Sequence, residues 1–281
     1  MTTTTPTTPE AADTAAAPEA AEPIILAEKL TKTFTARRRT GRMRSTREDF
    51  TAVDGIDLRV AAGELVGYIG PNGAGKSTTI KMLTGILTPT SGTLRVAGHE
   101  PQRDRVRLAR RIGVVFGQRT TLWWDLPLKD SFTLLQRLYR VPPDRFAANL
   151  AYYTEALDLG PFLDRPVRQL SLGQRMRGDI TAALLHDPAV VYLDEPTIGL
   201  DVVSKHAVRE FLADLNRRTG TTILLTTHDI ADIERLCSRI VAIDHGRVTY
   251  DGTIEALRAD RDLETVVREL YTGRSLVDTT E

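Results

Sequence analysis

The chain has 281 residues, 41% of them hydrophobic, which is enough for one sizeable core with a subdomain. Its 37 Lys and Arg residues balance its 37 Asp and Glu residues, so no formal net charge remains, and this argues against a general nucleic-acid binder. A single cysteine, Cys237, excludes an intrachain disulfide and a cysteine-rich metal site, and it fits a reducing cytoplasm.

Residues 1–23 are rich in Thr, Ala, Pro and Glu. They lack the basic start and the apolar core of a secretory signal, so we expect a disordered tail. No apolar run in the chain approaches the roughly 20 residues that span a bilayer. A role in transport would therefore need a pore formed by another polypeptide.

Residues 24–33 and 51–60 have the pattern of strands in a small antiparallel sheet. The stretch between them is longer than a hairpin needs, and we favour a solvated loop there. The alternative is a surface that meets anionic lipid headgroups or a membrane partner. Both interpretations concern the arginines Arg37, Arg38, Arg39, Arg42, Arg44 and Arg47.

A phosphate-binding loop follows a short buried strand predicted over residues 64–69. Its glycines let successive backbone N–H groups point at phosphate oxygens, and a helix begins at Lys76, where the dipole favours anions. We expect Lys76 to contact the outer phosphates, Ser77 to ligate magnesium and Thr78 to reach the α-phosphate. A plain glycine-rich turn is disfavoured by this strand–loop–helix context. The loop reads Gly70-Pro71-Asn72-Gly73-Ala74-Gly75-Lys76-Ser77-Thr78.

The remaining elements alternate between strands and helices. Strands are predicted near 93–97, 112–116, 190–193, 221–226 and 239–244, then a turn at His245-Gly246 and a strand to Tyr250. Between Gln118 and Asp187 the pattern is helical instead, and residues 261–281 look short and polar, with one helix and a loose end. The helical stripes are Phe132, Leu135 and Tyr139; Phe146, Leu150, Tyr153 and Leu157; and Val208, Phe211, Leu212 and Leu215.

Two acidic residues end the apolar run at 190–193. An aspartate at the carboxyl end of a buried strand can hold magnesium through water, and we assign this role to Asp194. Glu195 then stands where it can polarise an attacking water. A solvated acidic pair would be the better interpretation without the phosphate loop upstream.

In this order the motifs resemble those of the nucleotide-binding subunits of ABC transporters, over about residues 24–260. The resemblance implies an α/β fold with a mainly parallel P-loop NTPase core, an amino-terminal antiparallel β subdomain and a helical subdomain inserted at about 119–187. Residues 261–281 would be a short extension. The matching positions are Gly70–Thr78 as the phosphate loop, Gln118 as the Q-loop glutamine, Leu170–Gln174 as the signature peptide, Asp194 and Glu195 as the magnesium-binding and catalytic acids, Gly199–Asp201 as the D-loop and His228 as the switch histidine.

The resemblance also implies how ATP and Mg²⁺ are held. Two copies would trap two nucleotides head to tail, with the signature residues of one chain, Ser171, Gly173 and Gln174, facing the ATP of the other. Glu195 would activate the water, and His228 would contact it and the γ-phosphate. Gln118 would contact the metal. Asp201 belongs to the same nucleotide-binding set.

Two details depart from a simple match. Leu172 replaces the usual first glycine of the signature, and strain is expected if that position needs a positive φ, because leucine adopts one at a cost. Adenine usually stacks on an aromatic residue before the phosphate loop. We prefer Phe34 to Phe50 for this role, with core packing as the alternative for either.

Both tryptophans stand together after Gln118. In ABC subunits this surface receives a helix of the membrane subunit, so Trp123 and Trp124 serve either as anchors there or as core filling, and we expect one exposed and one buried. Together with the signature, this run resembles ATPase subunits of bacterial exporters whose permeases belong to the type 2 class.

The sequence therefore predicts an ATPase subunit at the cytoplasmic face of the membrane, paired with a second copy and with a separate permease, and binding no nucleic acid. A soluble ABC ATPase is the alternative, but such chains usually carry two nucleotide domains, coiled coils or zinc-binding cysteines. A third hypothesis, a non-hydrolysing partner in a heterodimer, would need a damaged catalytic set, whereas the catalytic residues are all present. The cargo is not encoded here, because cargo contacts in this family lie in the membrane subunit.

Overall fold

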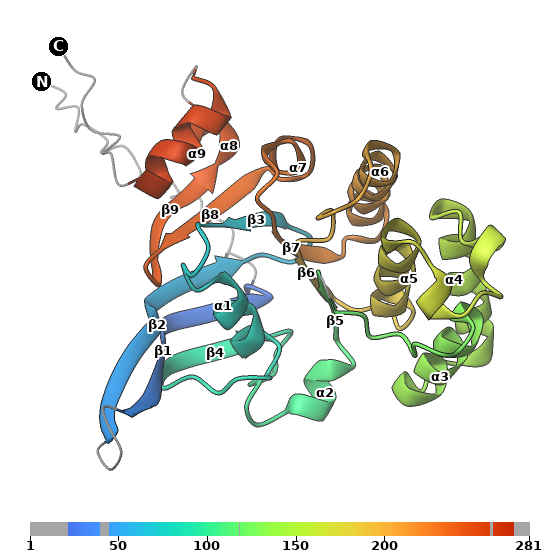
Figure 1. Cartoon of the computed structure of the whole chain (residues 1–281), viewed down its shortest axis with the longest axis horizontal. Coiled ribbons are helices and arrows are strands. Elements are labelled where there is room, and N and C mark those ends of the chain that lie inside the picture. The colour runs from blue at the N-terminus through green and yellow to red at the C-terminus, as the bar shows by residue number, and fades with distance from the viewer. Residues whose placement is uncertain (1–21, 40–44, 118, 259–260, 273–281) are drawn as a thin grey trace, which may run out of the picture.

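The computed structural model describes residues 22–39, 45–117, 119–258 and 261–272 (Figure 1). Within those ranges, none of the helices is both long enough and apolar enough to cross a membrane.

A six-stranded sheet forms the centre of the molecule, in the order β5-β6-β7-β3-β8-β9. All neighbours are parallel except β8 and β9. Because the carboxyl ends of parallel strands meet at one edge, the segments after β3, β6 and β7 lie together there. The strands are β3 (Leu65–Ile69), β5 (Ile112–Phe116), β6 (Val190–Asp194), β7 (Thr222–Thr226), β8 (Arg239–Asp244) and β9 (Arg247–Thr253).

Side chains of alternate residues on these strands enter two different cores, as the period of a β-strand requires. Leu65 and Leu193 belong to a cluster with the helices, whereas Val66 and Tyr192 belong to a cluster with the second sheet. Strands buried on both faces explain the continuous apolar runs in the sequence.

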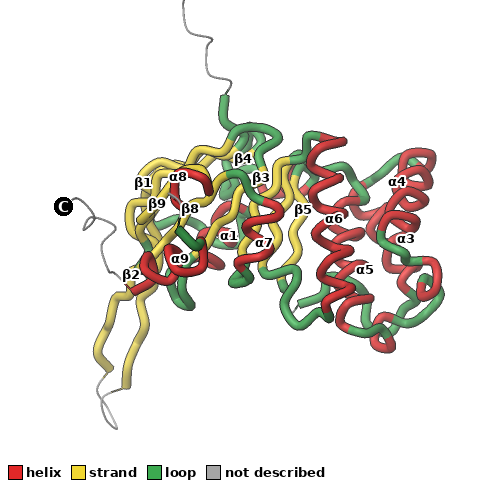
Figure 2. The backbone as a smooth tube through the Cα atoms, turned by 90° about the horizontal axis from the view of Figure 1, so that it is seen from above, coloured by secondary structure: helices red, strands yellow, loops and turns green. Residues whose placement is uncertain are grey.

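The second sheet is antiparallel, in the order β2-β1-β4, and comprises β1 (Ile25–Arg39), β2 (Ser45–Val60) and β4 (Ser91–Val96). The prediction of a loop over residues 37–47 is wrong where the structure describes it, because β1 and β2 continue as a paired ribbon to Arg39↔Ser45. Figure 2 shows this ribbon projecting beyond the rest of the molecule. Residues 25–39 contain no glycine or proline that would end the strand. Residues 40–44 lie outside the described part.

The helices α3, α4 and α5 gather at the side of the molecule opposite the ribbon (Figures 1 and 2). The predicted stripes lie on α3, α4 and α6 and pack into the core, as do Leu263, Val266 and Val267 of α9. The carboxyl-terminal segment is therefore amphipathic rather than polar. The helices are α1 (Lys76–Leu83), α2 (Arg105–Ala109), α3 (Leu128–Tyr139), α4 (Pro143–Ala156), α5 (Leu172–Leu184), α6 (Val202–Thr219), α7 (Ile230–Leu236), α8 (Ile254–Arg258) and α9 (Leu263–Thr272).

Candidate active site

The phosphate loop joins β3 to α1. Gly75 caps the helix with a φ of 110°, a conformation that an L side chain rarely adopts. The Lys76 ammonium lies folded across its own loop and donates to the Gly70 carbonyl at 2.6 Å and the Pro71 carbonyl at 3.1 Å. Burial lowers the pKa of Lys76, against the opposing effect of Glu195 and Asp194. The loop thus presents a desolvated cation at the amino end of a helix.

Two glycines of this loop are held so closely that no side chain fits. A Cβ at Gly70 would lie 2.3 Å from the carbonyl oxygen of Ile243, and one at Gly75 would lie 2.5 Å from that of Ala52. Strands β8 and β2 therefore both pack directly against the loop. Ala74 is buried, and its carbonyl accepts from Gly246 at 2.9 Å, which fixes the loop further.

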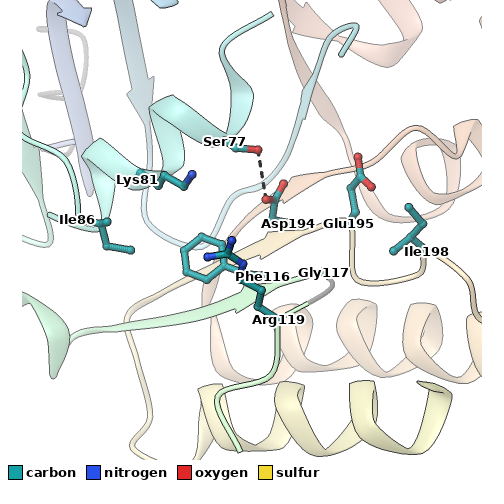
Figure 3. A pocket seen from close by; sticks show the side chains of 9 residues that line it. All are labelled: Ser77, Lys81, Ile86, Phe116, Gly117, Arg119, Asp194, Glu195 and Ile198. Carbon is teal, nitrogen blue, oxygen red and sulfur yellow. Dashed lines mark hydrogen bonds between the residues drawn. The ribbon is translucent and has the colours of Figure 1, made fainter. Parts of the chain in front are cut away.

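The Asp194 carboxylate faces the start of α1 from the end of β6 (Figure 3). Its Oδ2 lies 3.4 Å from Ser77 Oγ, and its Oδ1 accepts a hydrogen bond of 2.6 Å from Thr226 Oγ1. Thr226 ends the neighbouring strand and pairs with Asp194 in the sheet register. The carboxylate is thus oriented by one side chain while its other oxygen remains directed at Ser77.

Glu195 follows in an unusual conformation, with a φ of 55°. A left-handed backbone costs a non-glycine residue about 1–2 kcal/mol, and such outliers gather at functional sites. Its N–H donates to the Thr226 carbonyl at 2.9 Å, which holds the turn. Glu195 Oε1 lies 2.8 Å from His228 Nε2, so the predicted base and the predicted switch histidine are in contact.

Three cavities meet at Glu195, and two of them include residues of the phosphate loop. One, of about 420 Å³, is lined by Ser77, Asp194, Glu195 and the flanking residues Gly117 and Arg119 (Figure 3). Gln118 itself lies outside the described residues, but Gly117 donates to the Asp194 carbonyl at 2.7 Å and so ties this segment to the acidic strand end.

The second cavity, of about 290 Å³, combines the phosphate loop with both aromatic candidates. Phe34 and Phe50 are direct partners in the β1–β2 register and are 38% and 60% exposed, so neither is core filling. The phosphate-loop residues that line this cavity are Pro71, Asn72, Gly73, Gly75, Lys76, Ser77 and Thr78.

The signature peptide forms the start of α5. Ser171 Oγ accepts from Gln174 N at 3.2 Å, and Gln174 Oε1 accepts from Ser171 N at 3.0 Å, a reciprocal capping box. Leu172 is the first helical residue and has no positive φ, so the strain considered for it is absent. Ser171 and Asp201 are exposed, and neither lines any of the three cavities at Glu195.

Comparison with known proteins shows the family of this chain. Residues 53–198 match the family model described as ABC transporter. The daunorubicin resistance ATP-binding protein DrrA3 of Streptomyces coeruleorubidus is 38% identical over 224 residues, covering 79% of this chain and 70% of the relative.

The chain belongs to the ABC transporter family. It is an ATP-hydrolysing, ATP-binding subunit of that family. A Nod factor export ATP-binding protein I of Paraburkholderia xenovorans is 41% identical over 210 residues, covering 74% and 68% of the two chains. A dimeric ATP-binding cassette in a post-hydrolysis state with ADP and Pi bound superimposes with a TM-score of 0.69 and 26% identity, covering 82% of this chain and 98% of that one.

The paired tryptophans of this ABC subunit are both at the surface. Trp123 is 41% and Trp124 50% exposed, so the expectation of one buried ring is wrong. Leu122 takes the buried position instead, at 5% exposure. The guanidinium of Arg175, on the signature helix, lies 5.7 Å from the Trp124 ring.

Asp179 of α5 was missed from the sequence. Its Oδ1 accepts from Thr120 Oγ1 at 2.8 Å and Thr121 N at 3.0 Å, which fixes the segment after Gln118 to the signature helix. Burial raises the pKa of Asp179 to about 6, although these hydrogen bonds oppose the change. No motif marks it, because an Asp within a helix is ordinarily exposed.

Tyr271 of α9 was also missed from the sequence. Burial raises the pKa of Tyr271 to about 12, against the opposing effect of the nearby backbone of Gly70, the first residue of the phosphate loop. The apolar spacing of Leu263, Val266 and Val267 was the one signal that this helix packs on the domain.

A buried ion cluster supports the switch loop. Asp232, fully buried on α7, accepts from Thr227 Oγ1 at 2.9 Å and pairs with Arg209 of α6. Asp229 pairs with Lys205 at 2.8 Å and with Arg209 at 3.1 Å. His228, between Thr227 and Asp229, is therefore held by the helix that follows the D-loop.

Proposed function

We propose that this ABC ATPase works as a head-to-tail pair in which each ATP is held by Lys76 of one copy and Ser171 of the other. The observation that carries the proposal is the separation of the site into two surfaces. Lys76, Asp194 and Glu195 share cavities within one chain, whereas Ser171 caps its helix at an exposed surface outside them. A second copy would complete the site by placing its helix end against the terminal phosphate.

Each residue then has a physical task. Lys76 would exchange its two backbone carbonyl partners for phosphate oxygens, which as anions interact with an ammonium more strongly. Glu195 would orient the attacking water and accept its proton, and His228 would hold that carboxylate and then contact the γ-phosphate. Phe34, with Phe50 beside it, would stack on the base.

The oxygen ligands at the strand end suit Mg²⁺. Ser77 and Asp194 offer a hydroxyl and a carboxylate 3.4 Å apart, the hard oxygen donors that Mg²⁺ prefers. When bound, Mg²⁺ neutralises charge that develops on the phosphates. Gln118 would be a further ligand.

We further propose that the pair drives a separate permease in the direction of export, from the cytoplasmic face of the membrane. Both named relatives carry a drug-resistance or export function in their names. The exposed Trp123–Trp124 pair beside the Q-loop is the docking surface that such coupling needs. We retain residues 24–260 as the ATPase domain, with a helical subdomain at about 119–187.

The test is Glu195→Gln, with Glu210→Gln as the control at an exposed position of α6. We expect Glu195→Gln to bind ATP, to lower kcat at least about 100-fold, and to form a dimer on gel filtration only with MgATP. Adding Ser171→Ala should abolish that dimer. Hydrolysis at the wild-type rate would remove Glu195 as the base, and a dimer that survives Ser171→Ala would remove the shared site.

A further inference from the structure

The first residues of α5 lie directly against the D-loop of the same chain. A Cβ placed on Gly199 would be 2.8 Å from Leu172 Cδ2. A Cβ placed on Gly173 would be 2.8 Å from Ser204 Oγ and 3.9 Å from Asp201 Oδ2. The two segments therefore pack closely. Leu172 lies against Gly199, and Gly173 lies against Ser204 near the start of α6.

Leu172 occupies a position where the family usually has glycine. Its side chain makes the contact with Gly199, which a glycine at 172 could not make. Its half-buried side chain packs against the main apolar cluster, which includes the D-loop residue Leu200. A glycine at 172 would leave Gly199 without this apolar neighbour. Asp201 secures the other side, because its Oδ2 accepts from Ser204 Oγ at 2.7 Å and so fixes the hydroxyl that touches Gly173.

Gly199 is also close in the chain to the catalytic carboxylate. The loop from Glu195 to Leu200 is closed by hydrogen bonds, from Ile198 N to the Glu195 carbonyl and from Leu200 N to the Thr197 carbonyl, both at 3.3 Å. Ile198 lines the same cavity as Glu195 (Figure 3). A displacement of α5 that pushes on Gly199 would thus reach Glu195 through a short, hydrogen-bonded turn.

We propose that Leu172 is a positioning residue that couples the partner-facing signature peptide of each chain to the loop carrying that chain's own Glu195. This inference depends on the shared site proposed above. When Ser171 engages the partner's nucleotide, Leu172 transmits the movement of α5 to Gly199. The two sites of a pair then respond to ATP together, and hydrolysis is cooperative, with a Hill coefficient above 1.

The experiment compares Leu172→Ala with Leu172→Met, which keeps most of the volume of the side chain. ATP hydrolysis is measured against ATP concentration, with thermal unfolding of each variant alongside. We expect the wild type and Leu172→Met to be cooperative and Leu172→Ala to fall to a Hill coefficient of about 1, with the melting temperature lowered by only a few degrees, about 2–4 °C. A cooperative Leu172→Ala chain, or a wild type that pairs but is not cooperative, overturns the proposal.

A pair of glycines gives a second, matched test in which the single variants leave Leu172 unchanged. Gly199 and Gly220 have nearly the same φ, +69° and +65°, but a Cβ on Gly220 meets nothing within 4 Å. Alanine at either position should cost the same backbone strain, so we expect Gly199→Ala to lose more stability than Gly220→Ala and to change the Hill coefficient, which Gly220→Ala should not do. Introducing Leu172→Ala should remove the extra loss of Gly199→Ala. Equal effects of the two glycine variants overturn the contact.

Failure of the inference can be separated from failure of the shared site. The Glu195→Gln chain is analysed in parallel by gel filtration with MgATP. If no ATP-dependent dimer forms, the shared site and this inference fall together. If the dimer forms and Leu172→Ala leaves cooperativity unchanged, only the role of Leu172 falls.

Discussion

His228 Nε2 lies 2.8 Å from Glu195 Oε1, which joins the loop after β7 to the loop after β6. Neither side chain is fully buried, since the exposed fractions are 38% and 25%, so both are accessible from outside the protein. The contact holds the carboxylate in a defined direction without removing it from the cavity that contains Ser77 and Asp194.

Replacing His228 by alanine should therefore impair hydrolysis more than binding. We expect kcat to fall about 100-fold, because Glu195 loses the group that orients it, while Kd for ATP changes less than about threefold. The measurement is steady-state hydrolysis together with binding of a fluorescent ATP analogue. His99→Ala is the control, since His99 also faces a carboxylate, Asp104, but away from the site. A parallel loss of binding would contradict the role.

The two aromatic side chains beside the phosphate loop should differ in importance. We expect Phe34→Ala to weaken ATP binding about tenfold and Phe50→Ala to weaken it less, because stacking contributes about 0.5–1.5 kcal/mol and Phe50 is the more exposed ring. Calorimetric titration with ATP measures both. Val106→Ala, which truncates a remote side chain that is 72% exposed, should bind normally. The larger loss in Phe50→Ala would reverse the assignment.

Asp179 gives a dependence of stability on pH. Because its pKa is raised from 3.8 to about 6 in the folded chain, the folded state binds a proton more tightly than the unfolded state. The stability that this proton contributes is complete below pH 3.8 and is lost as the pH rises through about 6. Asn at 179 can still accept from Thr120 and Thr121 but cannot ionise.

We therefore expect Asp179→Asn to gain stability over the wild type as the pH is raised. Between pH 5 and pH 7.5 the difference in free energy of unfolding should grow by about 1 kcal/mol. Urea unfolding at several pH values measures it. Two profiles that run parallel across this range would show that the carboxyl does not titrate there.

Tyr271, on the last described helix, lies near enough to the backbone of Gly70 to affect its own pKa, so this side chain connects α9 to the phosphate loop. Tyr271→Phe should remove the polar interaction of this hydroxyl with the Gly70 backbone, lower the free energy of unfolding by about 1 kcal/mol and raise KM for ATP severalfold, because the loop is less well held. Tyr250→Phe is the matched control, since it loses a hydrogen bond to the Thr253 carbonyl far from the loop. A rise in KM for both variants would show that the effect is not specific to the loop.

Trp124 should matter for coupling and not for chemistry. We expect Trp124→Ala to keep the ATPase rate of the isolated chain but to lower its recovery in washed membranes at least about fivefold, as the loss of a central aromatic anchor would. Quantitative blotting of the membrane fraction measures it, with Val106→Ala as the control. Membrane recovery equal to that of the wild type would contradict docking through this ring.

The sequence by itself indicated most of the local elements of this protein and the candidate residues of a nucleotide site. The spacing of glycine and lysine residues is enough to predict a phosphate loop between a strand and a helix, which gave Lys76 its predicted role. An apolar run predicts a strand buried on both faces, which gave Asp194 its predicted place at a strand end. Parallel pairing then brings them together, because their strands share one edge of the sheet.

Other features were decided only by tertiary structure. The β1–β2 ribbon continues through the arginines because each strand is paired with the other, a long-range effect that local propensity does not contain. Tyr271 meets Gly70, and Leu172 meets Gly199, across large distances in the chain, and neither pair carries a sequence pattern. Periodicity shows which face of an element is buried, but only packing decides which partner that face meets.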